Sequence, residues 1–179
     1  MILTDYSRPK DLIRLKRSNG ANTYLILGGT SAWVDDNNPP EIPDGTKTIP
    51  DAFAACKATI MFGKKDVAGT YAAEIPDEDG NPVVTLFSEI VSEAALLAYT
   101  GEIFAIYQAT LSDSSIPLIT NWRKLGFATD LVPAAGHEAD TFLLAADVDT
   151  WGQLETLEYR KPYPVNPGAG HIFREVVQY

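Results

Sequence analysis

Cysteine is almost absent from this sequence of 179 residues, and its scarcity excludes two kinds of structure. Cys56 stands alone, so a disulfide within one chain cannot form, and neither can a zinc site built from several cysteines. Long apolar runs are also lacking, since no segment approaches the roughly 20 apolar residues that a membrane helix requires. The residues after Met1 resemble neither a secretory signal nor a transit peptide. These absences predict a protein that is made in the cytoplasm and has no membrane partner.

Catalytic motifs are scarce as well. The sequence contains no Walker A phosphate loop and no G-x-G-x-x-G. Residues 29–33 begin like the G-x-S-x-G elbow of serine hydrolases, but Trp33 stands where the closing glycine is required. Asp35 and Asp36 are adjacent, and neighbouring side chains of an extended chain point apart. We therefore expect this pair to cap or brace its loop and not to perform acid–base catalysis. Together these features predict that the protein is not an enzyme.

Metal-binding patterns are incomplete. Asp77, Asp79 and Asn81 alternate like the first ligands of a calcium loop, but glycine then falls at the fourth position and serine at the twelfth. A solvated turn fits this segment better. The two histidines, His137 and His171, have acidic residues nearby in the sequence but no evident set of convergent ligands. We expect no metal ion and no cofactor.

What the sequence does contain is enough apolar material for a core and an uneven charge. Hydrophobic residues make up 45% of the chain, which predicts a folded protein. The net charge is −10, and residues 1–17 carry five basic and two acidic residues, so this arm is +3 and the remainder is −13. The acidic body argues against a nucleic-acid partner. The arm either contacts an acidic neighbour, such as another copy, without completing the core, or is a solvated helix end.

Strand-like patterns outnumber helical ones. A short apolar run at residues 23–27 is closed by Gly28 and Gly29, which favours a buried strand. Residues 30–50 lack periodicity and contain four prolines, so they form a long loop. Pro50 is suited to the first turn of a helix, and Ser88 to a helix cap. The other expected elements are helices at 10–18, 50–57 and 89–99, a turn at 76–82, and strands at 59–62, 83–87, 103–111, 121–127, 154–159 and 171–179.

Many strands with few helices predict the fold class. We expect an α+β fold that is mainly antiparallel β and sandwich-like, with one to three short helices. Residues 1–20 would form a basic N-terminal arm with a helix, and residues 21–179 a single β-rich structural domain.

Four segments together resemble a known family. Tyr24 to Gly28, followed by Trp33-Val-Asp-Asp-Asn-Asn-Pro39-Pro40, is similar to the signature of baseplate wedge proteins from contractile-tailed bacteriophages. The tryptophan-to-diproline element is its most specific part. Three further segments follow in the family's order, at residues 60–67, at 121–126 through 130–133, and at 157–162 with 172–177.

The resemblance implies a structural virion protein of a contractile tail, a wedge-type baseplate subunit that acts through protein–protein contacts. Its partners would be other tail and baseplate proteins, with contacts between copies of the chain, and no nucleic acid or membrane. It would be made in the host cytoplasm and reside in the virion. The expected interface residues are Trp33, Asp35, Asp36, Pro39, Pro40, Arg14, Lys16, Arg17, Arg160 and Pro162.

Two alternatives remain open from the sequence. Trp33 either anchors an interface or plugs the core of its own chain. Trp122, Trp151 and eight tyrosines in a β-rich chain also suit a carbohydrate- or receptor-binding tail module, because exposed aromatic rings stack on sugars. Exposure of these rings separates the two functions. A tail-associated hydrolase ranks third, since the sequence lacks a convergent acid pair or nucleophile.

Overall fold

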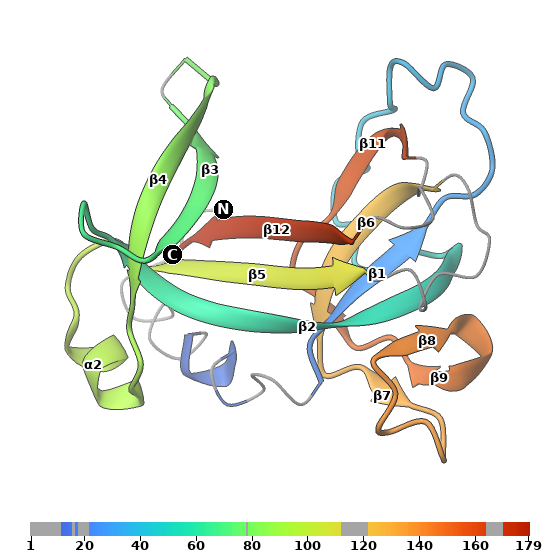
Figure 1. Cartoon of the computed structure of the whole chain (residues 1–179). Coiled ribbons are helices and arrows are strands. Elements are labelled where there is room, and N and C mark those ends of the chain that lie inside the picture. The colour runs from blue at the N-terminus through green and yellow to red at the C-terminus, as the bar shows by residue number, and fades with distance from the viewer. Residues whose placement is uncertain (1–11, 16, 18–21, 78, 112–121, 164–169) are drawn as a thin grey trace. The chain divides into compact units, whose positions relative to one another are not determined.

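The computed structural model describes residues 12–15, 17, 22–77, 79–111, 122–163 and 170–179, and strands dominate them (Figure 1). All the described strand registers are antiparallel, which confirms the expected mainly antiparallel α+β fold. Residues 12–15 and 17 are helical. The other elements are β1 (Tyr24–Gly28), β2 (Ala52–Lys65), β3 (Tyr71–Pro76), β4 (Pro82–Glu89), α2 (Glu93–Ala98), β5 (Phe104–Leu111), β6 (Trp122–Thr129), β7 (Val132–Pro133), β8 (Phe142–Leu144), a 3-10 helix (Ala145–Asp147), β9 (Val148–Thr150), β10 (Gln153–Leu154), β11 (Glu158–Tyr163) and β12 (His171–Gln178).

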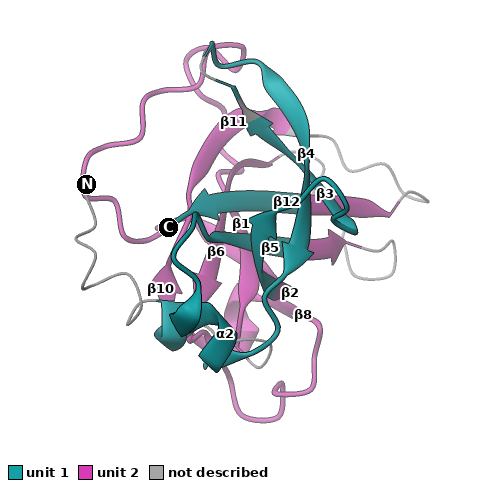
Figure 2. Ribbon diagram, turned by 90° about the vertical axis from the view of Figure 1, so that its left-hand side faces the viewer, with its two compact units in different colours: residues 1–19, 60–108, 174–179 teal, residues 20–59, 109–173 magenta. Residues whose placement is uncertain are grey.

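The chain divides into two compact units (Figure 2). Unit 1 comprises residues 1–19, 60–108 and 174–179, and unit 2 comprises residues 20–59 and 109–173. Strands β2, β5 and β12 each contribute residues to both units.

Unit 2 is built around β1. All five residues of this strand are buried, as the short apolar run predicted. It lies between β2 and β6, with Leu25 opposite Cys56 on one side and opposite Phe127 on the other. β10 and β11 also pair with β6, β8 pairs with β2, and β7 pairs with β9. A strand with partners on both edges and apolar residues on both faces is a stable centre for this unit.

The predicted helix at residues 50–57 is wrong. Residues from Ala52 onward belong to β2, which runs on through the expected strand at 59–62. Ala54, Ala55 and Cys56 are buried because β1 covers one edge of the strand and β8 the other, and these pairings override the helical preference of small residues. Cys56 Sγ lies 3.4 Å from the Thr110 carbonyl oxygen, and burial raises the pKa of this thiol to about 11.

Two further corrections concern strand and helix ends. The helix expected at 89–99 begins at Glu93, because Ser88 and Glu89 belong to β4 and pair with β2. Ser92, not Ser88, caps it by accepting a hydrogen bond from the Ala95 N–H at 3.0 Å. The strand expected at 154–159 is interrupted between β10 and β11, where the N–H groups of residues 155 and 156 both donate to the Phe127 carbonyl.

Unit 1 has its own core, and one of its residues, Ala73, comes from a strand that the sequence did not predict, β3. Phe87 and Phe104 meet edge to face with ring centroids 5.2 Å apart, and Ala73 and Ile106 complete the buried cluster. β3 pairs with β4 along its whole length. The alternation of its short sequence was too weak to distinguish it from a loop.

The N-terminal arm contradicts one expectation. Leu12 and Leu15 are fully buried, so the helical residues of the arm contribute to the core, which the sequence interpretation did not expect. The exposed Arg17 donates to Glu93 of α2 at 2.8 Å within the same unit. Lys16 lies outside the described residues. The arm therefore has a structural role whatever its basic side chains contact.

Candidate protein interface

The candidate interface is centred on residues 30–50, named here the Trp33 loop, which joins β1 to β2 without regular secondary structure. Gly29 begins the loop with a φ of 75°, a left-handed conformation that glycine adopts without steric cost. A side chain at Gly28 would overlap Ile49, which is buried at the other end of the loop against Ile26 and Ala128. Both ends of the loop are thus fixed on the same part of unit 2.

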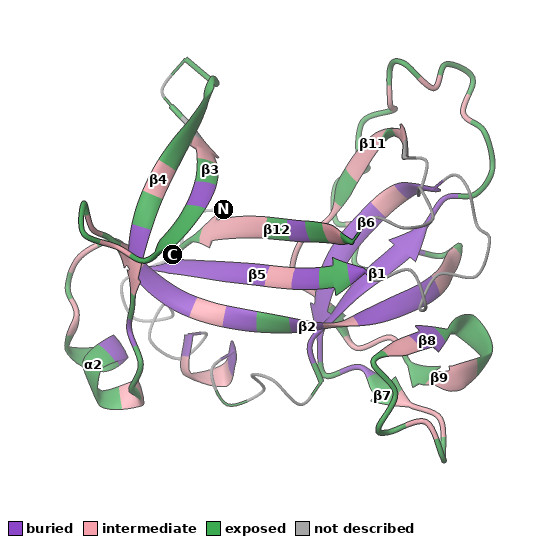
Figure 3. Ribbon diagram, in the orientation of Figure 1, coloured by how far each residue is buried: buried purple, intermediate pink, exposed green. Residues whose placement is uncertain are grey.

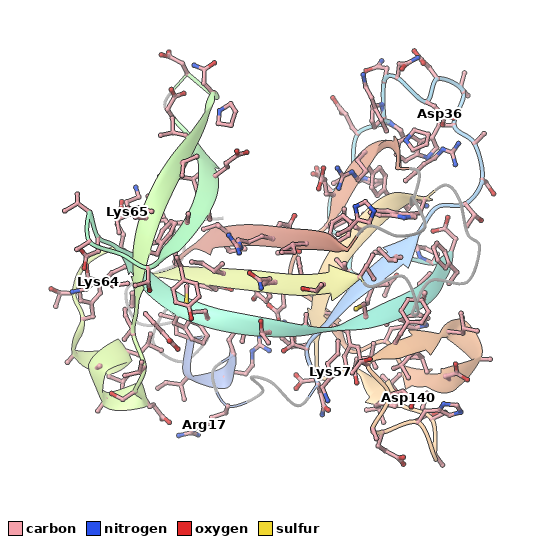
Figure 4. All side chains as sticks on the ribbon, in the orientation of Figure 1. Arg17, Asp36, Lys57, Lys64, Lys65 and Asp140 are labelled. Carbon is pink, nitrogen blue, oxygen red and sulfur yellow. The ribbon has the colours of Figure 1, made fainter. Side chains whose placement is uncertain are left out.

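An ion pair holds the first half of this loop. Arg123 of β6 donates from Nε to Asp36 Oδ1 at 2.6 Å and from Nη2 to Asp36 Oδ2 at 2.7 Å. The Arg123 side chain is 6% exposed, whereas that of Asp36 is 34% exposed. Figure 4 labels Asp36 on the loop between β1 and β2. Arg123 also donates to the Thr30 carbonyl at 3.2 Å. A planar guanidinium that donates two parallel bonds fixes orientation as well as distance, so Asp36 has a defined position.

The same carboxylate organises the backbone around Trp33. The Trp33 N–H donates to Asp36 Oδ1 at 3.1 Å. Hydrogen bonds from Arg123 hold the pKa of the Asp36 carboxyl below its usual range, and the backbone bond from Trp33 adds to this effect. The carboxylate therefore stays ionised at neutral pH. This bracing role for Asp36 is the one that the sequence predicted for the aspartate pair.

Trp33 is half-buried and packs on an aromatic side chain of β11. Its ring centroid lies 5.7 Å from that of Tyr159, and Lys124 Nζ lies 5.5 Å from the Tyr159 ring. Lys124 also bonds Asp51 at 2.9 Å. Trp33 is thus neither a fully buried core plug nor a free surface ring.

The other predicted interface residues of unit 2 surround this arrangement only in part. Asp35 is exposed and accepts a local hydrogen bond from the Asn37 N–H at 2.9 Å. Pro39 is half-buried and Pro40 exposed. Arg160 lies with its guanidinium 5.6 Å from the Trp122 ring, and Pro162 is half-buried nearby in the same strand. Arg14 and Arg17 belong to unit 1, whereas the Trp33 loop belongs to unit 2.

Sequence reasoning missed Arg123 and Tyr159, which hold the loop in place. Arg123 had a detectable signal, because it lies in a strand that also contains Trp122 and Leu125, and a charged residue that is buried there must find an acidic partner. The identity of that partner had no signal, since Asp36 is 87 residues away.

The loop offers exposed apolar contact area. Val34 is fully exposed and Ile42 is 39% exposed, and both lie among acidic and polar residues. Within the described ranges, no group of three or more His, Cys, Asp or Glu side chains is arranged to hold a metal ion. In the same part of the chain, no helix has the length and apolar character needed to cross a membrane.

One histidine with acidic neighbours, His137, lies elsewhere in unit 2. His137 Nδ1 is 2.9 Å from an Asp140 carboxylate oxygen, and Nε2 is 3.5 Å from Asp147. The bond with Asp140 is the main cause of a raised pKa of the imidazole, and the charges of Asp147 and Glu138 act in the same direction. Two carboxylates beside one imidazole ring favour its protonated form, so His137 forms local ion pairs with Asp140 and Asp147.

A family model described as "Baseplate wedge 3 tail fiber network component" matches residues 1–179. The chain belongs to this family. It is also 30% identical over 168 residues to "Virion protein 3" of Enterococcus phage phiEF24C, an alignment that covers 89% of this chain and 84% of the relative.

Membership of this baseplate wedge family confirms the resemblance found in the sequence. The chain is a structural virion protein of a phage baseplate, and as a baseplate component it contacts other phage tail proteins.

Proposed function

We propose that this baseplate subunit docks onto neighbouring tail proteins through the Trp33 loop and works without catalysis. The observation that carries the proposal is the double hydrogen bond between Asp36 and Arg123, which orders an exposed loop that would otherwise be free to vary. A surface that is ordered before binding loses less conformational entropy when a partner covers it.

The composition of the loop supports the same role. Four prolines restrict its backbone, and the fully exposed Val34 and the partly exposed Ile42 supply apolar contact area. Protein interfaces have an apolar centre and a polar rim, and Val34 and Ile42 among acidic and polar residues have that pattern. Trp33 supports the loop from beneath through its contact with Tyr159.

The finer parts of the proposal follow from charge and composition. Copies of the chain contact one another within the baseplate, through the basic side chains of the arm and the acidic remainder. The acidic body disfavours nucleic acid. We also propose that the subunit contacts no membrane and that it is synthesised in the host cytoplasm before assembly.

The carbohydrate-binding alternative loses one of its supports. Trp122 is 1% exposed and Trp151 is half-buried, so these two rings do not form an open platform for sugars. Trp122 instead packs on Phe173 with ring centroids 5.3 Å apart. We therefore favour protein partners.

The test separates docking from folding. Trp33→Ala and Val34→Ser are each produced as full chains, and their thermal stability alone and their incorporation into tails lacking the parent chain are measured. We expect Trp33→Ala to lose about 2 kcal/mol or more of assembly free energy. Val34→Ser should reduce incorporation without changing stability, and Asp35→Ala should have a smaller effect, because exposed charges contribute little affinity.

Val132→Ser is the matched control, because Val132 is a 44% exposed valine of the same unit outside the loop. If Val34→Ser and Trp33→Ala assemble as well as this control, the loop is not the docking surface.

A further inference from the structure

The β3–β4 hairpin, residues 71–89, has a second surface with the character of an interface. Its strands pair from Tyr71 opposite Phe87 to Pro76 opposite Pro82. β2 joins the hairpin at residues 87–89, where Lys65 pairs with Phe87. Beyond that base, the described residues add no third strand, so β3 and residues 82–86 of β4 form a two-stranded ribbon.

Figure 3 colours much of this ribbon as exposed. Exposed apolar residues lie on both of its faces. Val84 is 63% exposed and Leu86 38% exposed on the face that also carries Ala72 and Glu74. Val83 is 45% exposed on the opposite face. A two-stranded hairpin in water is marginally stable by itself, and a contiguous exposed apolar surface commonly marks a site that a partner covers.

Hydrogen bonds connect the described residues at the tip of the hairpin. The Asp77 carboxylate accepts the N–H groups of Asp79 at 3.0 Å and Asn81 at 2.8 Å. These bonds hold the pKa of Asp77 below its usual range, with the bond from Asn81 the largest cause. Pro76 and Pro82 close the strand ladder, and neither has an N–H group to extend it. The hairpin is therefore preorganised for insertion between other elements.

The charge of the hairpin identifies the chemistry of its partner. Residues 71–89 contain five acidic residues and no lysine, arginine or histidine. The acidic residues are Glu74, Asp77, Glu78, Asp79 and Glu89. A complementary surface must be apolar at its centre and basic at its edges. The body of a second copy does not meet this condition, because the chain outside residues 1–17 carries a net charge of −13. The basic arm of a second copy does not meet it either, because its described leucines, Leu12 and Leu15, are buried and cannot line an apolar groove.

We propose that the β3–β4 hairpin inserts into an apolar groove flanked by lysine and arginine side chains on a different protein of the tail. The proposal rests on the role of the chain as a baseplate subunit, and it is independent of docking through the Trp33 loop. The hairpin and the loop would then give the subunit two contact surfaces with different partner chemistry.

Variants of the full chain test the contact. Val84→Ser combined with Leu86→Ser removes the apolar face, and Glu74→Lys reverses the charge that lies beside Val84 in the ladder. We expect each to reduce incorporation into tails by about tenfold or more while the purified chain keeps its melting temperature. Glu74→Gln should fall between Glu74→Lys and the parent. Val67→Ser is the control, because Val67 is a 97% exposed valine outside the hairpin, and it should assemble normally.

A photo-crosslinking residue at position 84 of the otherwise unchanged chain tests the partner without destabilising substitutions. We expect a cross-link to another tail polypeptide in a segment with lysine or arginine, and a yield that falls as salt shortens electrostatic range from about 8 Å at 0.15 M to about 3 Å at 1 M. A cross-link to a second copy, a partner segment without basic residues, or a salt-independent yield overturns the proposal, as does normal incorporation of the variants. None of these outcomes depends on Trp33, so failure here is distinguishable from failure of the loop.

Discussion

Arg123 is a charged side chain on a buried strand, and Asp36 offsets the cost of burying that charge by accepting two of its hydrogen bonds. The pair shows what single-residue reasoning can and cannot give. A bracing role for the aspartates followed from their adjacency, because neighbouring side chains of an extended chain point apart. The partner on β6 could not be predicted, because the two residues are 87 positions apart and nothing local links them.

The Asp36–Arg123 pair predicts strong coupling between its two residues. Arg123→Met should lower the melting temperature, because it leaves Asp36 and the Thr30 carbonyl without their donor. Asp36→Asn should do the same. A double variant should lose little more than the worse single variant, since both substitutions remove one interaction. Thermal unfolding of the four proteins measures the coupling, and strictly additive losses would show that the two side chains act independently.

His137 predicts a pH-dependent contribution to stability. Its pKa in the folded chain is raised by the bond with Asp140, whereas in the unfolded chain it has the ordinary value of about 6.5. The stabilisation is therefore complete below about pH 6.5 and is lost as pH rises through the folded-state pKa. His137→Gln should reduce the free energy of unfolding at acidic pH and have little effect well above neutrality.

Urea unfolding of the parent and His137→Gln at several pH values checks this, and NMR titration should give a His137 midpoint above about 6.5. A stability difference that grows toward alkaline pH would contradict a stabilising ion pair between His137 and its acidic neighbours.

At the scale of elements, the sequence correctly predicted elements that are determined by the pattern of neighbouring residues. The strand at residues 23–27 was correct, because an apolar run closed by two glycines has few alternatives. The segment at 50–57 was assigned to a helix because alanine is the best helix former, yet β1 and β8 cover both edges of that segment. Pairing with distant strands decided its conformation, and no local pattern encodes such pairing.

Substitution of a buried residue in the N-terminal helix should reduce folding stability, whereas the sequence favoured an effect of the arm on assembly. Leu15→Ala should lower the free energy of unfolding by about 2–5 kcal/mol, because Leu15 is fully buried and its truncation leaves a cavity. Arg17→Ala, at an exposed ion pair with Glu93, should change it by less than about 1 kcal/mol. Chemical denaturation of both variants decides the matter, and unchanged stability of Leu15→Ala would return the arm to the role of a docking segment.

At the scale of the whole molecule, the class of protein followed from the resemblance of four sequence segments to baseplate wedge proteins, and the family match confirms it. The scarcity of catalytic motifs predicted only that the protein is not an enzyme. The division into an arm of residues 1–20 and one domain of residues 21–179 stays a prediction. The ten interface residues also stay a prediction, because partner contacts depend on surfaces that a single chain does not contain.

The whole chain should show no turnover of peptidoglycan, polysaccharide or peptide substrates. The reason is that the sequence contains neither a phosphate loop nor a complete nucleophile elbow, and its described residues hold no group of three or more His, Cys, Asp or Glu side chains arranged for a metal ion. Release of reducing ends or amines by purified protein is the measurement. Turnover that persists through purification and disappears on substitution of Asp35, Asp36 or His137 would establish an enzyme instead.

The burial of Cys56 has a consequence for the particle once it has left the cell. A pKa of about 11 leaves roughly one thiol in ten thousand as the reactive thiolate at neutral pH, and the surrounding strands keep oxidants away from it. Air oxidation therefore has no accessible sulfur with which to join copies of the chain by stray disulfides. The durability of this subunit in an oxidising medium depends on packed strands. Its single thiol stays unreactive for as long as β2 remains folded.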